Sequence, residues 1–352
     1  MVAVVEPWQE PVRGGYADPA ILSMTGLDQM RAWNQGLMPV PPMAHLTGIR
    51  MAEAGMGTCA FTMPASPWFL PPQGLISIGV LAVLADPPLG CAIQTTLPPA
   101  TPYATAELSL TAVRPVYGTG RILCAQGRVV HPGRRMALSE ATVEDEAGRL
   151  VAHGTSRCMI LPQLEDVPAA DGLKTLHPAD DTQDPWRRPV MGEVLPQSVW
   201  DRQNGLEVLR LLLARELPRA PISYLTGMRL AEVAPGSAAF VLPASGWLGS
   251  PTGFIEGGLI AMLADTALQS AILTVAPAGC AVASVDLKVN FLRPASTDGR
   301  TLVGSGKVVH QGRSVVIANA EVLNAEHKRV ALATGSALLL PGRPASLEDA
   351  AE

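Results

Sequence analysis

Two carboxylates stand within apolar stretches of the sequence, where a charged group is costly to bury. Asp265 interrupts the apolar run 259–268, and Asp86 is followed at once by Pro87 and Pro88. Burial raises the pKa of a carboxyl group toward the range in which it can act as a general base near neutral pH. We expect this role for Asp265, the alternative being a carboxylate on a solvent-facing stripe. Because proline disrupts helices, the helix that carries Asp86 is expected to kink or end there, which favours a decayed site.

The segment before Asp265 offers backbone donors. Glu256, Gly257 and Gly258 open a long apolar stretch that we expect to be a helix. A helix N-terminus presents unpaired N–H groups and the positive end of the helix dipole, which suit an oxyanion or a polarised carbonyl. The alternative is a tight turn in which Glu256 complements the dipole. Ile78 and Gly79 keep backbone donors at the corresponding position of the first half.

The chain repeats itself at an offset of 179 residues. LTGIRMAE at 46–53 recurs as LTGMRLAE at 225–232, and VVHPGR at 129–134 recurs as VVHQGR at 308–313. From 26 to 162, about 50 of roughly 137 aligned positions are identical, which is a strong repeat signal. The two halves therefore share one fold.

The repeat and the composition divide the chain into two domains. We expect a flexible lead (1–20), a first domain (21–162), an acidic and Pro-rich linker (163–200), a second domain (201–341) and a tail (342–352). The second domain shows a helical pattern over 205–217, strand patterns over 222–233 and 236–242, and a long buried helix over 255–275. Four further strands, bounded by turns, are expected over 281–292, 301–310, 314–324 and 329–340. The fold class is α+β, with an antiparallel sheet around a buried helix in each half.

Composition excludes several classes of protein. The net charge of −5 and the aromatic content of 4% argue against nucleic-acid binding. The five cysteines have no CxxC spacing, and the histidines have no metal-ligand spacing, so no metal site is expected. The N-terminal residues do not resemble a signal peptide, and no apolar run is long enough to span a membrane. We expect a cytoplasmic protein.

Three segments of the second half carry a family resemblance. GFIEGGLIAMLADTALQSAI, SVDLKVNFLRPA and GKVVHQGRSVVIANAEV together resemble the hotdog-fold acyl-CoA thioesterases of the phenylacetate-pathway (PaaI) type. The resemblance extends to the first half through the repeat. It implies two tandem hotdog domains that pair as an intramolecular pseudo-dimer, and hydrolysis of an acyl-CoA without a cofactor.

The resemblance also implies roles for individual residues. The family's helix carboxylate, a general base or nucleophile, corresponds to Asp265 and Asp86, and its Ser/Thr corresponds to Ser284 and Thr105. The remaining positions correspond as follows: the oxyanion glycine to Gly257 and Ile78, the histidine to Glu256 and Ser77, and the asparagine to Ser250 and Pro71. Because hotdog sites form between subunits, one composite site would join Asp86 and Thr105 to Ser250, Glu256 and Gly257, with Gly258 beside them as a substrate-binding residue. The other would join Asp265 and Ser284 to Ser77, Ile78 and Gly79.

Some features leave alternatives open. Arg134 and Arg313 lie in matching turns and could meet CoA phosphates, although arginines in exposed turns are usually only solvated. The double hotdog could also bind acyl-CoA or an acyl carrier without catalysis, or act as a hydratase. Single hotdog dimers commonly assemble further, so a homo-oligomer is expected. The expected partners include neither nucleic acid nor a membrane.

Overall fold

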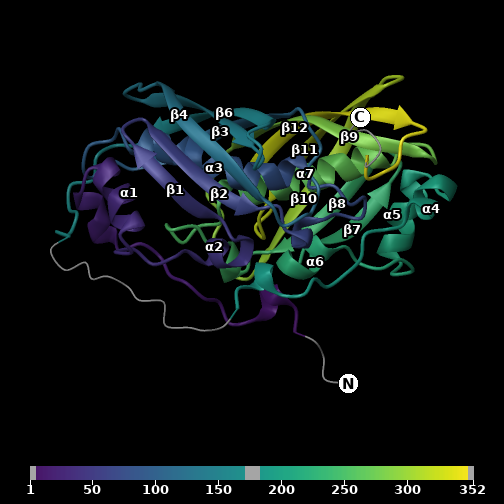
Figure 1. Ribbon diagram of the computed structural model, residues 1–352, viewed down its shortest axis with the longest axis horizontal. Helices are drawn as coiled ribbons and strands as arrows, with labels where there is room; N and C mark the ends of the chain where they lie inside the picture. The colour runs from purple at the N-terminus through teal and green to yellow at the C-terminus, as the bar shows by residue number, and fades with distance from the viewer. Residues whose placement is uncertain (1–4, 171–182, 348–352) are drawn as a thin grey trace.

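The computed structural model describes residues 5–170 and 183–347 (Figure 1). The first repeat contains α1 (Gly26–Asn34), α2 (Pro42–Thr47), β1 (Arg50–Gly55), β2 (Thr58–Pro64), α3 (Ile78–Gln94), β3 (Tyr103–Ala112), β4 (Ile122–His131), β5 (Met136–Glu144) and β6 (Leu150–Ile160). The second contains α4 (Gln197–Arg202), α5 (Gly205–Leu213), α6 (Pro221–Thr226), β7 (Arg229–Ala234), β8 (Ser237–Pro243), α7 (Gly257–Leu273), β9 (Cys280–Phe291), β10 (Thr301–Gln311), β11 (Val315–Leu323) and β12 (Arg329–Pro341). This order confirms the α+β class.

All the strands join one sheet that crosses both repeats. The sheet has 12 strands in the order β1-β2-β4-β5-β6-β3-β9-β12-β11-β10-β8-β7. Antiparallel pairing of β3 with β9 joins the halves, and Ser109 lies opposite Lys288, its own counterpart in the repeat. A residue that faces its own counterpart marks a two-fold axis, as in an isologous dimer interface. The halves therefore pair as an intramolecular pseudo-dimer.

The two long helices cover one face of this sheet and contact each other at the centre of the molecule (Figure 1). Each helix comes close to a strand at a glycine. On the first repeat this is Gly127, where an added Cβ would lie 2.3 Å from the carbonyl oxygen of Pro88 in α3. On the second repeat it is Gly306, where an added Cβ would lie 2.2 Å from the carbonyl oxygen of Ala267 in α7. Any larger residue in these strand positions would push the helix away from the sheet.

Two element boundaries differ from those expected from the sequence. Helix α3 does not end at Pro87 and Pro88 but continues to Gln94, and it has the same 17 residues as α7. Most of its side chains are buried, so tertiary packing outweighs the hydrogen bonds that the prolines remove. The strand pattern that begins at residue 222 is also interrupted, because α6 occupies its first part before β7 begins. Pro221 at the first position favours that helix, and Gly227 ends it with φ of 76°.

The predicted lead and linker contain a matched pair of ordered arms. EPWQEPV at 6–12 and DPWRRPV at 184–190 each begin with a short 3₁₀ helix, and each arm lies on the opposite repeat. The Trp247 indole N–H donates to the carbonyl of Glu10 at 3.0 Å, and the Trp68 indole N–H donates to that of Arg188 at 3.1 Å. In Figure 1 the purple N-terminal segment runs along the lower edge of the molecule. The repeat thus includes the arms as well as the domains.

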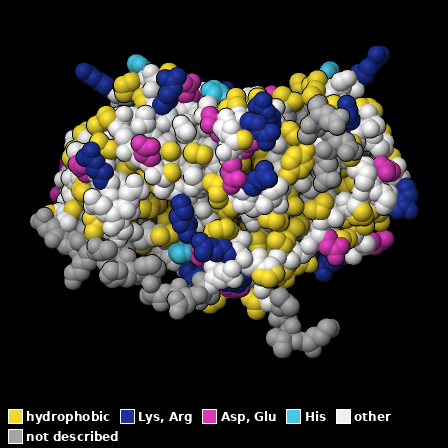
Figure 2. All heavy atoms as spheres, viewed as in Figure 1, with side chains coloured by type: hydrophobic (Ala, Val, Ile, Leu, Met, Phe, Trp, Pro, Cys, Tyr) yellow, Lys and Arg dark blue, Asp and Glu magenta, His cyan; other side chains and the backbone are white. Residues whose placement is uncertain are grey.

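Apolar residues remain on the surface of this fold. Figure 2 shows many apolar side chains across the central part of the viewed face, with charged side chains both among and around them. Across residues 5–170 and 183–347, no helix is both long and apolar enough to span a membrane.

Candidate active site

The starts of the two long helices exchange hydrogen bonds with carboxylates of the opposite repeat. The Gly79 N–H donates to Oδ2 of Asp265 at 2.9 Å, and the Gly258 N–H donates to Oδ2 of Asp86 at 3.1 Å. The two contacts are related by the pseudo-two-fold axis. Each carboxylate therefore meets the N-terminus of the other repeat's helix, and the fold contains two composite sites.

Close packing at this crossing requires glycine. A Cβ on Gly79 would lie 2.7 Å from Cβ of Asp265, and a Cβ on Gly258 would lie 2.5 Å from the backbone of Val83. Real Cβ atoms do not approach so closely, so both glycines serve the packing of α3 on α7. Gly79 and Gly258 are therefore required for the packing of the two helices, and both also donate hydrogen bonds to the carboxylates.

Asp265 occupies an environment that suits a general base. Its side chain is fully buried, and burial raises its pKa to about 6, against the lowering effect of the hydrogen bond from the Gly79 N–H. Oδ2 accepts the hydrogen bond from Gly79, whereas Oδ1 has no partner among the described residues. The carboxylate is thus held by one oxygen, and the other oxygen is available to accept a proton.

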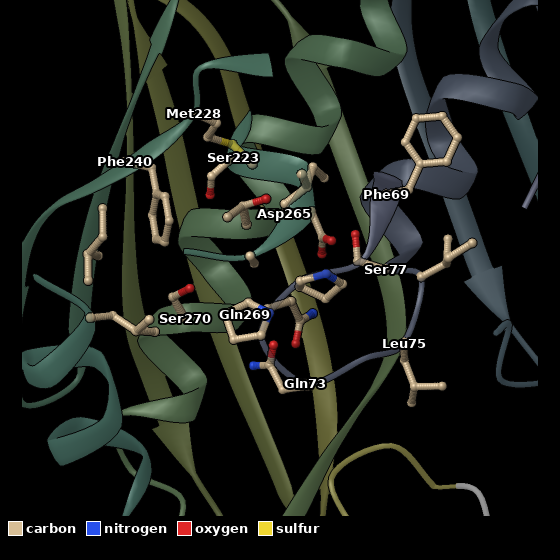
Figure 3. A pocket seen from close by; sticks show the side chains of 18 of the residues that line it. Phe69, Gln73, Leu75, Ser77, Ser223, Met228, Phe240, Asp265, Gln269 and Ser270 are labelled. Atoms are coloured by element: carbon tan, nitrogen blue, oxygen red, sulfur yellow. The ribbon is translucent and has the colours of Figure 1, made fainter. Parts of the chain in front are cut away.

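A cavity of about 1070 Å³ adjoins this carboxylate (Figure 3). Polar residues from both repeats line the cavity, namely Gln73, Ser77, Thr266, Gln269, Ser270 and Ser284. Ile78 and apolar residues of the second repeat line it as well, namely Leu209, Leu212, Ile222, Met228, Leu230 and Phe240. A cavity lined by apolar side chains together with a few polar groups is typical of a small-molecule site.

The start of α3 lies beside this cavity. Ser77 is the N-cap of the helix, and its side chain accepts a hydrogen bond from the Val80 N–H at 3.3 Å. Ile78 is the first helical residue, so its N–H has no partner within the helix. Ile78 also lines the cavity, in the position that the family resemblance assigns to the oxyanion donor. A backbone donor does not depend on the side chain, so isoleucine can replace glycine in this role.

Gln269 is a site residue that sequence reasoning missed. It follows Asp265 by four residues on α7 and therefore lies on the same helix face. Both polar atoms of its amide are buried and have no hydrogen-bond partner within the described part of the chain. Buried polar groups are normally paired, so this amide is available to a ligand or a water molecule. The i, i+4 spacing from Asp265 was the sequence signal that could have revealed it.

The second composite site contains two carboxyl groups. Glu256 caps α7 by accepting from the Leu259 N–H at 3.0 Å, and burial and the Asp86 charge raise its pKa well above the usual range. Burial also raises the pKa of Asp86, against the lowering effects of the Glu256, Gly258 and Thr105 contacts. Oδ1 of Asp86 and Oε1 of Glu256 otherwise have no partner among the described residues. A proton kept on Glu256 can bridge the two groups.

A tyrosine fills part of this second site. Gly90 and Tyr103 occupy the positions that Gln269 and Val282 hold in the other repeat. A Cβ added to Gly90 would lie only 2.8 Å from the Tyr103 hydroxyl oxygen, so the phenol takes the space of a side chain there. Burial raises the pKa of Tyr103 well above its usual range, so the phenol stays protonated. The two composite sites are therefore different in shape.

Other predicted site residues lie away from the cavity. Ser250 shares a hydrogen bond with Thr252 in an exposed turn, with 2.9 Å between the hydroxyl oxygens. Arg134 and Arg313 are exposed in their hairpins, and the described cavity at Asp265 does not include them. Gly257 lies against Asp86, since a Cβ there would be 2.5 Å from Oδ2. Within residues 5–170 and 183–347, no three His, Cys, Asp or Glu side chains are grouped to hold a metal ion.

Part of the second repeat matches a known protein family. Residues 252–331 match the thioesterase superfamily. A Halobacterium salinarum protein named as an esterase is 36% identical over 96 residues, which is 25% of this chain and 62% of that relative's length. The match thus spans less than two thirds of that relative.

Solved structures resemble the whole double unit. A TesB protein of Mycobacterium avium subsp. paratuberculosis has a TM-score of 0.51 at 15% identity, covering 85% of this chain and 98% of its own. A hot dog fold protein of unknown function from Alicyclobacillus acidocaldarius has a TM-score of 0.52 at 14% identity, with the same coverage of 85% and 98%. These similarities confirm the hotdog fold. The chain thus has a tandem hotdog fold, and residues 252–331 of its second repeat match the thioesterase superfamily.

Proposed function

We propose that this protein hydrolyses an acyl-CoA thioester at the composite site of Asp265. The observation that carries the proposal is the position of Asp265 itself. Its carboxylate is anchored by the Gly79 N–H, has one oxygen without a partner, and adjoins a cavity of about 1070 Å³. A pKa of about 6 leaves the group ionised at neutral pH and still basic enough to accept a proton.

The reaction needs only water and the thioester. Asp265 accepts a proton from a water molecule while the water oxygen adds to the carbonyl carbon. The N–H of Ile78 is placed at the helix start to stabilise the oxyanion that forms. The C–S bond then breaks, the thiolate takes up the proton from Asp265, and a carboxylic acid and CoA leave. Gln269 can orient the water or the carbonyl through its unpaired amide.

The rim of the cavity supports a phosphate-bearing thioester. Arg114, Arg215 and Arg229 are exposed and belong to the residues that line the cavity. A guanidinium group matches phosphate geometry and keeps its charge at any physiological pH. These residues replace Arg134 and Arg313 as candidates for contacts with the CoA phosphates.

In this proposal, only the Asp265 site of each chain hydrolyses the thioester. Glu256 faces Asp86 in the second composite site, and Tyr103 fills the space that corresponds to Gln269. With Glu256 beside Asp86 and the Tyr103 phenol in the same space, this site has less room for a thioester and a water molecule. Thr105 remains beside Asp86, but we propose that this pair is structural.

Thiol release from a panel of short, medium, long and aromatic acyl-CoA substrates tests the proposal. We expect wild-type protein to release CoA from at least one class. If no substrate is cleaved while calorimetry still detects acyl-CoA binding, the protein is a binding module and the proposed hydrolysis is wrong. Formation of a homo-oligomer stays a prediction, which sedimentation velocity can test.

A further inference from the structure

The two arms make equivalent contacts with the opposite repeats. The Trp8 ring covers Gly227, where an added Cβ would lie 2.7 Å from the ring, and the Trp186 ring covers Gly48 at 2.8 Å. Both glycines have positive φ, at 76° and 80°, and both end the short helix that precedes β7 or β1. The arms are thus a matched pair in their packing.

Only the first of these matched arms belongs to the cavity described at Asp265. Glu6, Trp8 and Gln9 line that cavity, whereas none of the lining residues comes from the 184–190 arm. The Glu6 carboxylate accepts from Arg219 Nη1 at 2.6 Å, from Arg219 Nη2 at 3.0 Å and from the Trp8 indole N–H at 2.8 Å. The corresponding position of the first repeat is Val40, so this anchor is particular to the arm at Asp265.

We propose that the arm formed by residues 6–12 is a specificity element of the Asp265 site, in which Trp8 closes the chamber for the acyl group and limits its length. This inference rests on the proposed thioester hydrolysis. It goes beyond that proposal because it assigns substrate selection to a segment outside both hotdog domains.

The surroundings of Trp8 favour an acyl group over the CoA phosphates. Met228 follows Gly227 directly and lines the cavity together with Phe240, so apolar side chains form part of the cavity wall near the residue that the indole covers. The Arg219 guanidinium at this wall is engaged by both oxygens of Glu6 and stacks on the Tyr224 ring at 4.0 Å. A cation that is already neutralised by a carboxylate is a poor ligand for phosphate. The chamber at this end therefore suits an uncharged alkyl chain.

Two matched variants test the inference, Trp8→Ala and Trp186→Ala. Both remove an indole that covers a helix-ending glycine, but only Trp8 lines the cavity. The measurement is kcat/KM for saturated acyl-CoA substrates of increasing chain length, expressed as the ratio between chains. This ratio is independent of the fraction of folded enzyme, so a loss of stability does not move it.

In Trp8→Ala we expect kcat/KM for the chain preferred by the wild type to fall about tenfold relative to longer chains, since hydrophobic pockets discriminate chain length by about this factor per methylene group. Trp186→Ala should keep the wild-type ratios. Unchanged ratios in Trp8→Ala, or the same change in both variants, would overturn the inference while the proposed hydrolysis stands.

A second measurement separates the two proposals. If wild-type protein cleaves no acyl-CoA, the proposed function fails, and binding of saturated fatty acids by calorimetry then tests the arm alone. Weaker binding, or a longer preferred chain, in Trp8→Ala but not in Trp186→Ala would support the arm's role. Equal binding by the two variants, or no binding by the wild type, would overturn it.

Discussion

Replacing Asp265 with asparagine should stabilise the protein at neutral pH. Burial raises the pKa of Asp265 from 3.8 to about 6, so the folded state holds its proton more tightly than the unfolded state. Stability therefore falls as the pH rises from about 4 to 6 and stays lower above that range. At about 1.4 kcal/mol per pKa unit, the ionised carboxylate costs about 3 kcal/mol at pH 8. Asparagine has no charge to bury, and its carbonyl oxygen can still accept from the Gly79 N–H.

Urea unfolding of wild type and Asp265→Asn at pH 8 and pH 4 measures this effect. We expect the variant to gain about 3 kcal/mol at pH 8 and less than about 1 kcal/mol at pH 4, where the wild-type group is protonated in the folded state. Asp298→Asn is a useful comparison, since Arg300 holds the pKa of that exposed carboxyl below its usual range and no gain is expected there. A variant less stable than wild type at pH 8, or a gain independent of pH, would refute the reasoning.

Three further predictions concern the same site. Because the base must be ionised, kcat/KM for thiol release should fall about tenfold per pH unit below pH 6, as a pH–rate profile will show. Gly79→Ala would place a Cβ 2.7 Å from Cβ of Asp265, so overpacking of about 1–3 kcal/mol should lower Tm in calorimetry and reduce activity. Gln269→Leu should lower kcat by about tenfold or more with little change in Tm, because the lost amide orients the reacting groups rather than the fold. An unchanged kcat in Gln269→Leu, a Tm of Gly79→Ala equal to that of wild type, or a rate that is flat down to pH 4.5 would each contradict the corresponding prediction.

The sequence predicts the architecture well because the duplication is strong and because the pattern of turns and apolar residues is regular. The α+β class, the tandem hotdog domains and the long buried helix are all confirmed. Local patterns were less informative about element ends. α3 continues through Pro87 and Pro88 because its burial on the sheet outweighs a local propensity that the sequence alone would follow.

Features that depend on space between side chains could not be predicted. Nothing in the sequence marks Gly90 and Tyr103 as special. Only their contact in the structure shows that the Tyr103 phenol fills the space that the side chain of Gln269 occupies in the other repeat. The cavity at Asp265 likewise depends on how side chains of α5, α6 and β8 leave room for one another. The arms are a different case, since EPWQEPV and DPWRRPV are visible as a repeat in the sequence, at an offset of 178 rather than 179.

The assignment of catalysis to one of two related carboxylates is tested most directly by comparing Asp265→Asn with Asp86→Asn. The measurement is kcat/KM for CoA release from the best substrate of the panel, at pH 7.5, on variants shown to be folded. We expect a loss of about 100-fold or more in Asp265→Asn, as for removal of a general base, and activity within about threefold of wild type in Asp86→Asn. Full activity in Asp265→Asn, or its loss in Asp86→Asn alone, would contradict the account.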